Sequence, residues 1–253
     1  MTLLLLTLAA IGLLLFLILV VKLHAFLAML LTSMGLGLAS GMPPAAVIRS
    51  IQNGFGEALG FIAIVLGLGA MIGAYLEHSG GGRALADWLL VRFGRDRAAW
   101  AMLIASFLVG LPIFFEVGFI ILVPLVWNLA RESKRSLLIY GLPMAAALTI
   151  NHALIPPHPA PAAAAQLLGA DLGHVILYGI ALSLPMSIVG GILYGGWIGR
   201  RIYVPVPDIA TRLDSTQSDL QGSDLQTTAK PPAVPLVILI LLLPVLFILA
   251  ATV

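Results

Sequence analysis

Two short stretches of the chain place polar side chains beside glycine and proline within otherwise apolar sequence. The first runs from Gly110 to Gly118 and reads GLPIFFEVG, and its Glu116 is the one carboxylate between residues 98 and 130. A charged side chain at the depth of a membrane costs at least ~2.5 kcal/mol on insertion scales, which favours a working role. We predict that Glu116 carries a proton. The structural alternative is a carboxylate that reaches water at a turn or caps the following helix.

The second stretch surrounds the proline-rich sequence PPHPAP at residues 156–161. Asparagine and threonine hydrogen-bond to hydroxyl and carboxylate groups, and histidine titrates in the physiological range. We therefore predict a substrate-binding set and a proton-coupling pair. The substrate-binding set comprises Gly118, Thr149, Asn151, His152 and His158, and the proton-coupling pair is Glu116 and His152. The structural alternatives are a helix-packing position for His152 and a loop position in bulk water for His158.

Catalytic and metal chemistry lack the residues that they need. The sequence has no cysteine, which excludes disulfides, thiolate metal sites and cysteine nucleophiles. His152 and His158 supply two metal ligands without a third nearby, and Asp171 and the serines lack the nucleophile-elbow context of a hydrolase. We expect no cofactor, no metal and no enzyme activity. Nothing resembles the carbonyl filter or the charged ring of a channel.

The composition indicates a protein whose solvent is largely lipid. Hydrophobic residues make up 60% of the chain and charged residues 9%, whereas a soluble domain carries about 25% charged residues. Too few charges are present to cover a surface that faces water. The net charge of +2 is small and the basic residues are scattered, so we expect no nucleic-acid partner.

Long apolar runs predict an all-α integral membrane protein, because about 20 apolar residues cross the hydrocarbon core as a helix. The expected spans lie near residues 3–21, 23–40, 57–76 and 174–198, with a polar loop at 77–97, a cytoplasmic linker at 203–232 and a last span at 233–253. The first run is expected to be retained. No Lys or Arg precedes it and no small-residue cleavage site follows it, as a signal peptide would require.

The apolar run at 98–130 is too long for one ordinary span and too short for two. If it crossed the membrane, the basic residues would divide into five on one side and eight on the other. If it forms a re-entrant hairpin, and 137–170 crosses once as a broken helix, twelve basic residues share one face and Arg49 alone faces the other. Lys and Arg accumulate on the cytoplasmic side. The hairpin interpretation therefore prevails, with a periplasmic N-terminus in a multi-pass protein of the bacterial inner membrane.

Both polar stretches then become interruptions of helices at membrane depth. Non-helical backbone is tolerated there only inside protein or beside a watery cavity. Secondary transporters build their substrate sites from such interruptions, and the N-terminus of a half-helix favours an anion. We predict an anion site where the two interruptions meet.

In these two motifs, ALIPPHPAP at 153–161 and GLPIFFEVG at 110–118, the sequence resembles the gluconate permease family of bacterial symporters. The resemblance runs from the first predicted span to the last. It implies proton-driven transport of gluconate, a related sugar-acid anion or D-serine. It also implies two inverted repeats, each with a re-entrant hairpin and a broken helix, and assembly as a homodimer.

The length of the chain departs from this pattern. Members of the family are expected to be nearly twice as long, so residues 1–202 correspond to a first repeat and residues 233–253 to the first span of a truncated second repeat. Either another polypeptide supplies the missing C-terminal half or the chain is a fragment. The alternative functions are an inactive half-transporter and a membrane subunit that needs a partner.

Overall fold

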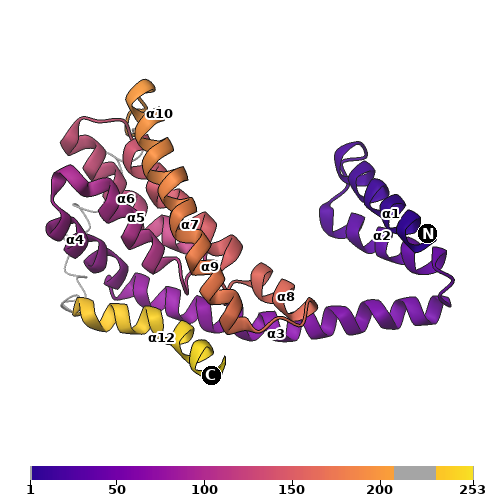
Figure 1. Cartoon of the computed structure of the whole chain (residues 1–253). Helices are drawn as coiled ribbons and strands as arrows, with labels where there is room; N and C mark the ends of the chain where they lie inside the picture. The colour runs from indigo at the N-terminus through magenta and orange to yellow at the C-terminus, as the bar shows by residue number, and fades with distance from the viewer. Residues whose placement is uncertain (1, 208–231, 253) are drawn as a thin grey trace, which may run out of the picture. The chain divides into compact units, whose positions relative to one another are not determined.

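The computed structural model describes residues 2–207 and 232–252, and every regular element in this part of the chain is a helix. This observation confirms the predicted all-helical fold class. The helices form two compact units, Met1–Ala63 and Ile64–Val253, which we describe separately (Figure 1).

The first unit contains two apolar helices and the beginning of a third. α1 (Thr2–Leu19) packs against α2 (Ala25–Ala39), as a helical hairpin requires. In the turn between them, Lys22 adopts the left-handed backbone conformation, with a φ of 57°. The His24 side chain then accepts a hydrogen bond from the Phe26 N–H and caps the start of α2.

The third helix, α3 (Pro44–His78), is longer than the predicted span at 57–76. It is 35 residues long and begins at Pro44, so the helix extends beyond the predicted membrane span on its N-terminal side. Gly41 ends the α2 turn with a left-handed φ of 84°, and proline is pre-organised for the first position of the helix that follows. The polar residues after Pro44 are compatible with a helix but lower the mean hydropathy of this segment. A search for long apolar runs therefore finds only the later part of α3.

The second unit corrects the predicted polar loop at 77–97, because most of it is α4 (Gly81–Phe93). Leu85 and Leu89 lie four residues apart on one helix face, and both are buried. Glycine at position 82 permits close packing of α4. A Cβ added to Gly82 would lie 2.9 Å from Cγ2 of Ile121.

The predicted hairpin region contains two helices joined by a turn, α5 (Ala98–Val109) and α6 (Phe115–Ser133). The apolar residues of α5 continue around the whole helix, and eight of its 12 residues are buried. A helix that is apolar on every side belongs in a protein interior or a membrane. α5 therefore lies at the centre of the second unit, packed against α4 and α7.

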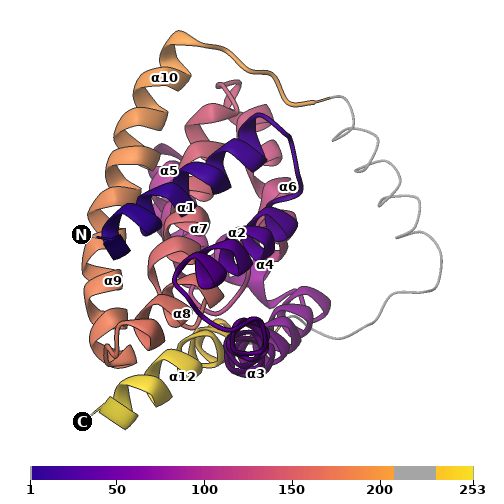
Figure 2. The same cartoon turned by 90° about the vertical axis from the view of Figure 1, so that its right-hand side faces the viewer.

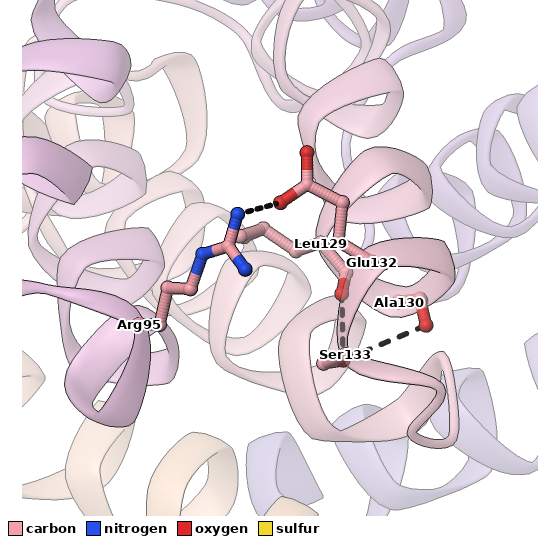
Figure 3. A network of polar contacts seen from close by, with 5 residues as sticks. All are labelled: Arg95, Leu129, Ala130, Glu132 and Ser133. Carbon is pink, nitrogen blue, oxygen red and sulfur yellow. Dashed lines mark hydrogen bonds and ion pairs between the residues drawn. The ribbon is translucent and has the colours of Figure 1, made fainter.

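An ion pair links the chain just before α5 to the end of α6. Arg95 lies in the short helix η1 (Arg95–Arg97), and its Nη2 donates to Oε2 of Glu132 at 3.1 Å (Figure 3). Close by, the Ser133 hydroxyl donates to the Leu129 carbonyl at 2.6 Å. Both charged side chains are mostly exposed, so the pair contributes at most about 1 kcal/mol.

The proline-rich stretch interrupts a helix, as the sequence predicts. α7 (Leu138–Leu154) ends at an extended Ile155, and α8 (Pro159–Leu167) begins four residues later. The Pro156–Pro157 peptide bond is cis. Two prolines at the beginning of α8 cannot continue a hydrogen-bonded turn from α7, because they lack N–H groups.

A long helical rod lies beside α7 (Figure 2). It consists of α9 (Leu172–Ser187), the π-helix η2 (Ile188–Tyr194) and α10 (Gly195–Arg201). A small buried residue recurs at every fourth position of this rod. The stripe comprises Gly179, Ser183, Ser187, Gly191, Gly195 and Gly199.

The π-helix explains how so long a stripe keeps facing α7. In an α-helix every fourth residue advances by about 40° around the axis, so the stripe would drift away from its neighbour. The wider turns of a π-helix rotate residues in the opposite sense. Gly191 and Gly195 pack against Pro143 and Leu142 of α7, because glycine lets the two helices approach closely.

The last helix, α12 (Val234–Thr252), packs on α9 and α4. Within the described residues, three helical segments are long and apolar enough to cross a membrane, and they are Leu138–Leu167, Leu172–Arg201 and Val234–Ala251. Most of the predicted linker at 203–232 lies outside the described residues, so its position stays a prediction.

The packing of the rod on α7 predicts that Gly191→Ala destabilises the protein. The new Cβ would lie 2.7 Å from the Cα atom of Pro143, a backbone atom that cannot turn aside. We expect a loss of about 1–3 kcal/mol, as for other overpacked sites, measured by thermal unfolding in detergent. Gly196→Ala is the matched control, because its Cβ would meet nothing within 4 Å. Equal stability of the two variants would contradict this account of the rod.

Candidate functional site

The C-terminal end of α5 is the point at which the two helix interruptions meet. The last carbonyl groups of a helix have no partner within it. Here the Phe107 carbonyl accepts a hydrogen bond from Nδ2 of Asn151 at 2.7 Å, and the Gly110 carbonyl accepts one from Nε2 of His158 at 2.9 Å. Two polar side chains from α7 and its break therefore cap α5.

The glycines of the first motif permit this close approach. Leu148 of α7 lies against both Gly110 and Gly118, since a Cβ added to either glycine would come within 3.0 Å of its Cδ2 atom. Gly118 is buried. Packing against Leu148 leaves no room for a larger side chain at this position. The predicted contact of Gly118 with substrate stays a prediction.

Two imidazole rings and a phenyl ring lie together at the break. The His152 and His158 ring centroids are 4.7 Å apart, and Phe114 lies 5.9 Å from each. His158 is only 2% exposed, so the alternative of a loop residue in bulk water is wrong. A carbonyl only accepts, so Nε2 of His158 carries the proton in this hydrogen bond.

Three buried polar atoms near this junction have no hydrogen-bond partner within the described part of the chain. They are Oδ1 of Asn151, Nδ1 of His152 and Oγ of Ser106. A buried polar group left without a partner costs about 1–3 kcal/mol. Within the described residues, these three atoms therefore lie unpaired where the sequence predicts a polar ligand. We call Ser106, Asn151, His152 and His158 the break cluster.

Ser106 is the residue of the break cluster that the sequence analysis missed. It is fully buried in α5, and its carbonyl accepts a hydrogen bond from the Gly110 N–H. A signal was present, because Ser106 is the one polar side chain between residues 98 and 109. Its position four residues before Gly110 places it in the last turn of α5, beside the predicted interruption.

Glu116 lies at the edge of the break cluster. It occupies the first turn of α6 and is exposed, and its carboxylate is within range of an electrostatic interaction with the His158 ring. A negative charge is favourable at the N-terminus of a helix. The N-cap residue Phe114 supplies no side-chain hydrogen bond, so the first N–H groups of α6 stay available.

The two half-helix N-termini differ in what they offer an anion. α6 presents ordinary backbone N–H groups in its first turn. In α8, Pro159 and Pro161 have none, so Ala160 supplies the one N–H of the first three positions. The expectation that both interruptions offer N–H groups thus holds better for α6.

Thr149, like Gly118, is a predicted substrate-binding residue that lies outside the break cluster. It is exposed on α7, whereas Asn151 is fully buried. Residues two apart in a helix point in different directions. Asn151 turns toward α5, so Thr149 turns away from it, and its predicted contact with substrate is untested.

The whole chain, residues 1–253, matches the model of the GntP family permeases. The chain belongs to this family. Relatives include a gluconate permease of Pseudomonas aeruginosa, 40% identical over 91% of this chain and 50% of the relative, and a gluconate permease of Bacillus subtilis, 45% identical over 72% and 40%. The inner membrane permease YgbN of Escherichia coli is 38% identical over 100% of this chain and 56% of the relative.

This GntP-family chain is an integral membrane protein of a transporter family rather than an enzyme. It spans about half the length of the curated relatives that it matches. No solved structure matches the chain. Among the described residues, no group of three histidine, aspartate or glutamate side chains could hold a metal ion.

The capping of α5 predicts that Asn151→Leu lowers stability. The substitution removes the N–H donor and leaves the buried Phe107 carbonyl without a partner. We expect a loss of about 1–3 kcal/mol, measured by denaturant or thermal unfolding in detergent. Thr149→Val, an exposed change on the same helix, should stay within about 0.5 kcal/mol of the wild type. The capping role fails if Asn151→Leu is as stable as that control.

The contact between Gly118 and Leu148 predicts coupled effects. Gly118→Ala should cost about 1–3 kcal/mol because its Cβ would lie 2.9 Å from Leu148 Cδ2. Leu148→Ala should cost about 2–5 kcal/mol through the cavity that it leaves. The new methyl group occupies part of that cavity, so the double variant should lose clearly less than the sum. A double-mutant cycle measures this coupling, and strict additivity would contradict the contact.

Proposed function

We propose that this chain forms part of a proton-coupled carrier of gluconate or a related small sugar-acid anion in the bacterial inner membrane. The observation that carries the proposal is the break cluster, where three buried polar atoms lack partners among the described residues. Relatives named gluconate permease, high-affinity gluconate transporter and L-idonate transporter support the substrate class.

The chemistry of the break cluster suits a polyhydroxy acid. Oδ1 of Asn151 accepts hydrogen bonds from substrate hydroxyl groups, and the Ser106 hydroxyl both donates and accepts. The uncapped N-terminus of α6 offers N–H groups and a positive dipole end to the substrate carboxylate. The predicted contacts of Thr149, Gly118 and His158 complete the binding set. His158 also holds the shape of the site through Gly110.

Glu116 and His152 are the proposed proton carriers. Glu116 is exposed beside the break cluster, where it exchanges protons with an aqueous pathway. Nδ1 of His152 is buried without a partner, and its ring lies 4.7 Å from that of His158. Proton binding near the anion site lowers the cost of holding a negatively charged substrate there. The proton and the anion would thus favour each other's binding.

We further propose that α5 and α6 form a re-entrant hairpin and that α7 and α8 cross as a broken helix, in one of two inverted repeats. With 12 residues, α5 spans about 18 Å, too short for a hydrocarbon core of about 30 Å. In this topology nearly all basic residues face the cytoplasm, the N-terminus is periplasmic and the carrier is a homodimer, as the family resemblance implies.

The second candidate function is a membrane subunit that transports only with a partner for the second repeat. The match to about half of each relative favours it, together with the exposure of Glu116 beside the buried break cluster. Uptake that depends on co-expression of a polypeptide with the second repeat would identify this case. Uptake by the chain expressed alone would exclude it.

The proton-carrier role predicts that Glu116→Gln uncouples transport. Labelled gluconate uptake into vesicles from permease-deficient cells that carry the gene with its flanking sequence should lose its stimulation by an inward proton gradient, because glutamine cannot release a proton. Glu132→Gln is the matched control, since it removes a carboxylate from the other end of α6. Unchanged pH dependence of uptake in Glu116→Gln would show that another group carries the proton.

A further inference from the structure

A basic cleft lies at the other end of α7, away from the break cluster. It has a volume of about 510 Å³, and three arginines line it, together with Ser136 and Tyr203. The arginines are Arg135, Arg200 and Arg201. Among the described residues, no acidic side chain lines the cleft, and none of the three arginines forms an ion pair with a carboxylate. Within the described part of the chain, the cleft therefore presents positive charge that no carboxylate offsets.

Hydrogen bonds hold the walls of this cleft in place. The buried Ser136 hydroxyl donates to the Ile202 carbonyl at 2.8 Å and accepts from the Val204 N–H at 3.0 Å. The Leu137 N–H donates to the Val204 carbonyl at 3.0 Å. The segment after α10 is thereby fastened to the beginning of α7. The arginines project from a preformed support rather than from a free tail.

The position of the cleft places it at the boundary between membrane and water. The segments Leu138–Leu167 and Leu172–Arg201 are both long and apolar enough to span a membrane, and the cleft lies where the first begins and the second ends. Tyr203, which lines the cleft, is 68% exposed, and Trp197, whose ring contacts Arg201, is 51% exposed. Tryptophan and tyrosine gather at membrane interfaces.

We propose that this cleft binds the phosphate of an anionic phospholipid headgroup. Guanidinium groups hold phosphate oxygens in bidentate geometry, and basic pockets between membrane helices bind anionic headgroups. The Arg201 guanidinium lies 4.5 Å from the centre of the Trp197 ring, which orients it beside the apolar surface that acyl chains would cover. A free phosphate shares the headgroup chemistry but gains nothing from this surface.

The test compares lipid retention by the purified full chain in detergent, using native mass spectrometry. Phosphatidylglycerol and phosphatidylcholine are supplied separately at equal concentration. Phosphatidylglycerol is also supplied together with equimolar inorganic phosphate. The variant Arg135→Gln/Arg200→Gln removes two cleft charges. Arg92→Gln/Arg97→Gln removes two exposed charges elsewhere and is the matched control. A salt titration of the wild type supplies a readout that does not depend on the folding of any variant.

We expect the wild type to retain phosphatidylglycerol over phosphatidylcholine, and added salt to weaken that retention. The cleft variant should bind phosphatidylglycerol about thirtyfold more weakly, because each cation near a lipid surface contributes roughly fivefold. The control variant should match the wild type. Equal losses in both variants, insensitivity to salt, or wild-type retention by the cleft variant would overturn the site. Displacement of the lipid by equimolar inorganic phosphate would overturn the lipid assignment in favour of a soluble anion.

Discussion

The free carbonyl groups at the end of α5 impose the constraint on which the second unit depends. α5 ends among buried residues, where neither lipid nor an apolar core can satisfy a carbonyl group. The side chains of Asn151 and His158 satisfy those of Phe107 and Gly110. These bonds join the two helix interruptions. Within the described residues, three buried polar atoms of the break cluster have no partner. The hydrogen bonds of Asn151 and His158 thus cap α5 and also define the proposed binding site.

Close packing around α7 makes these short hydrogen bonds possible. On one side Leu148 fills the space left by Gly110 and Gly118. On another, the small-residue stripe of the α9–α10 rod lies directly on the α7 backbone at Pro143. α7 is therefore held by glycine on two faces, and its polar residues are placed by rigid contacts. Sites on well-supported helices are more exact than sites on loops.

Sequence patterns predicted the apolar character of the chain, the two interruptions and four polar residues at or beside them. They failed at α4, where Leu85 and Leu89 form an apolar face within a segment rich in arginine. They also did not indicate that α3 begins at Pro44, because the polar residues there continue a helix without adding hydropathy. In both segments, charge and hydropathy indicate whether the chain prefers water or lipid. Helix formation depends instead on the spacing of apolar residues and on the capping of helix ends.

The sequence by itself determined the lipid environment and the places where helices break, because apolar composition, proline and glycine act on the chain locally. Only the tertiary structure decided which polar atoms of the break cluster have a hydrogen-bond partner among the described residues and which have none. The partners of Asn151 and His158 lie 44 and 48 residues away along the chain. Which of two neighbouring helical residues faces α5, Thr149 or Asn151, depends on how α7 is rotated, and the packing of α5 and the α9–α10 rod sets that rotation.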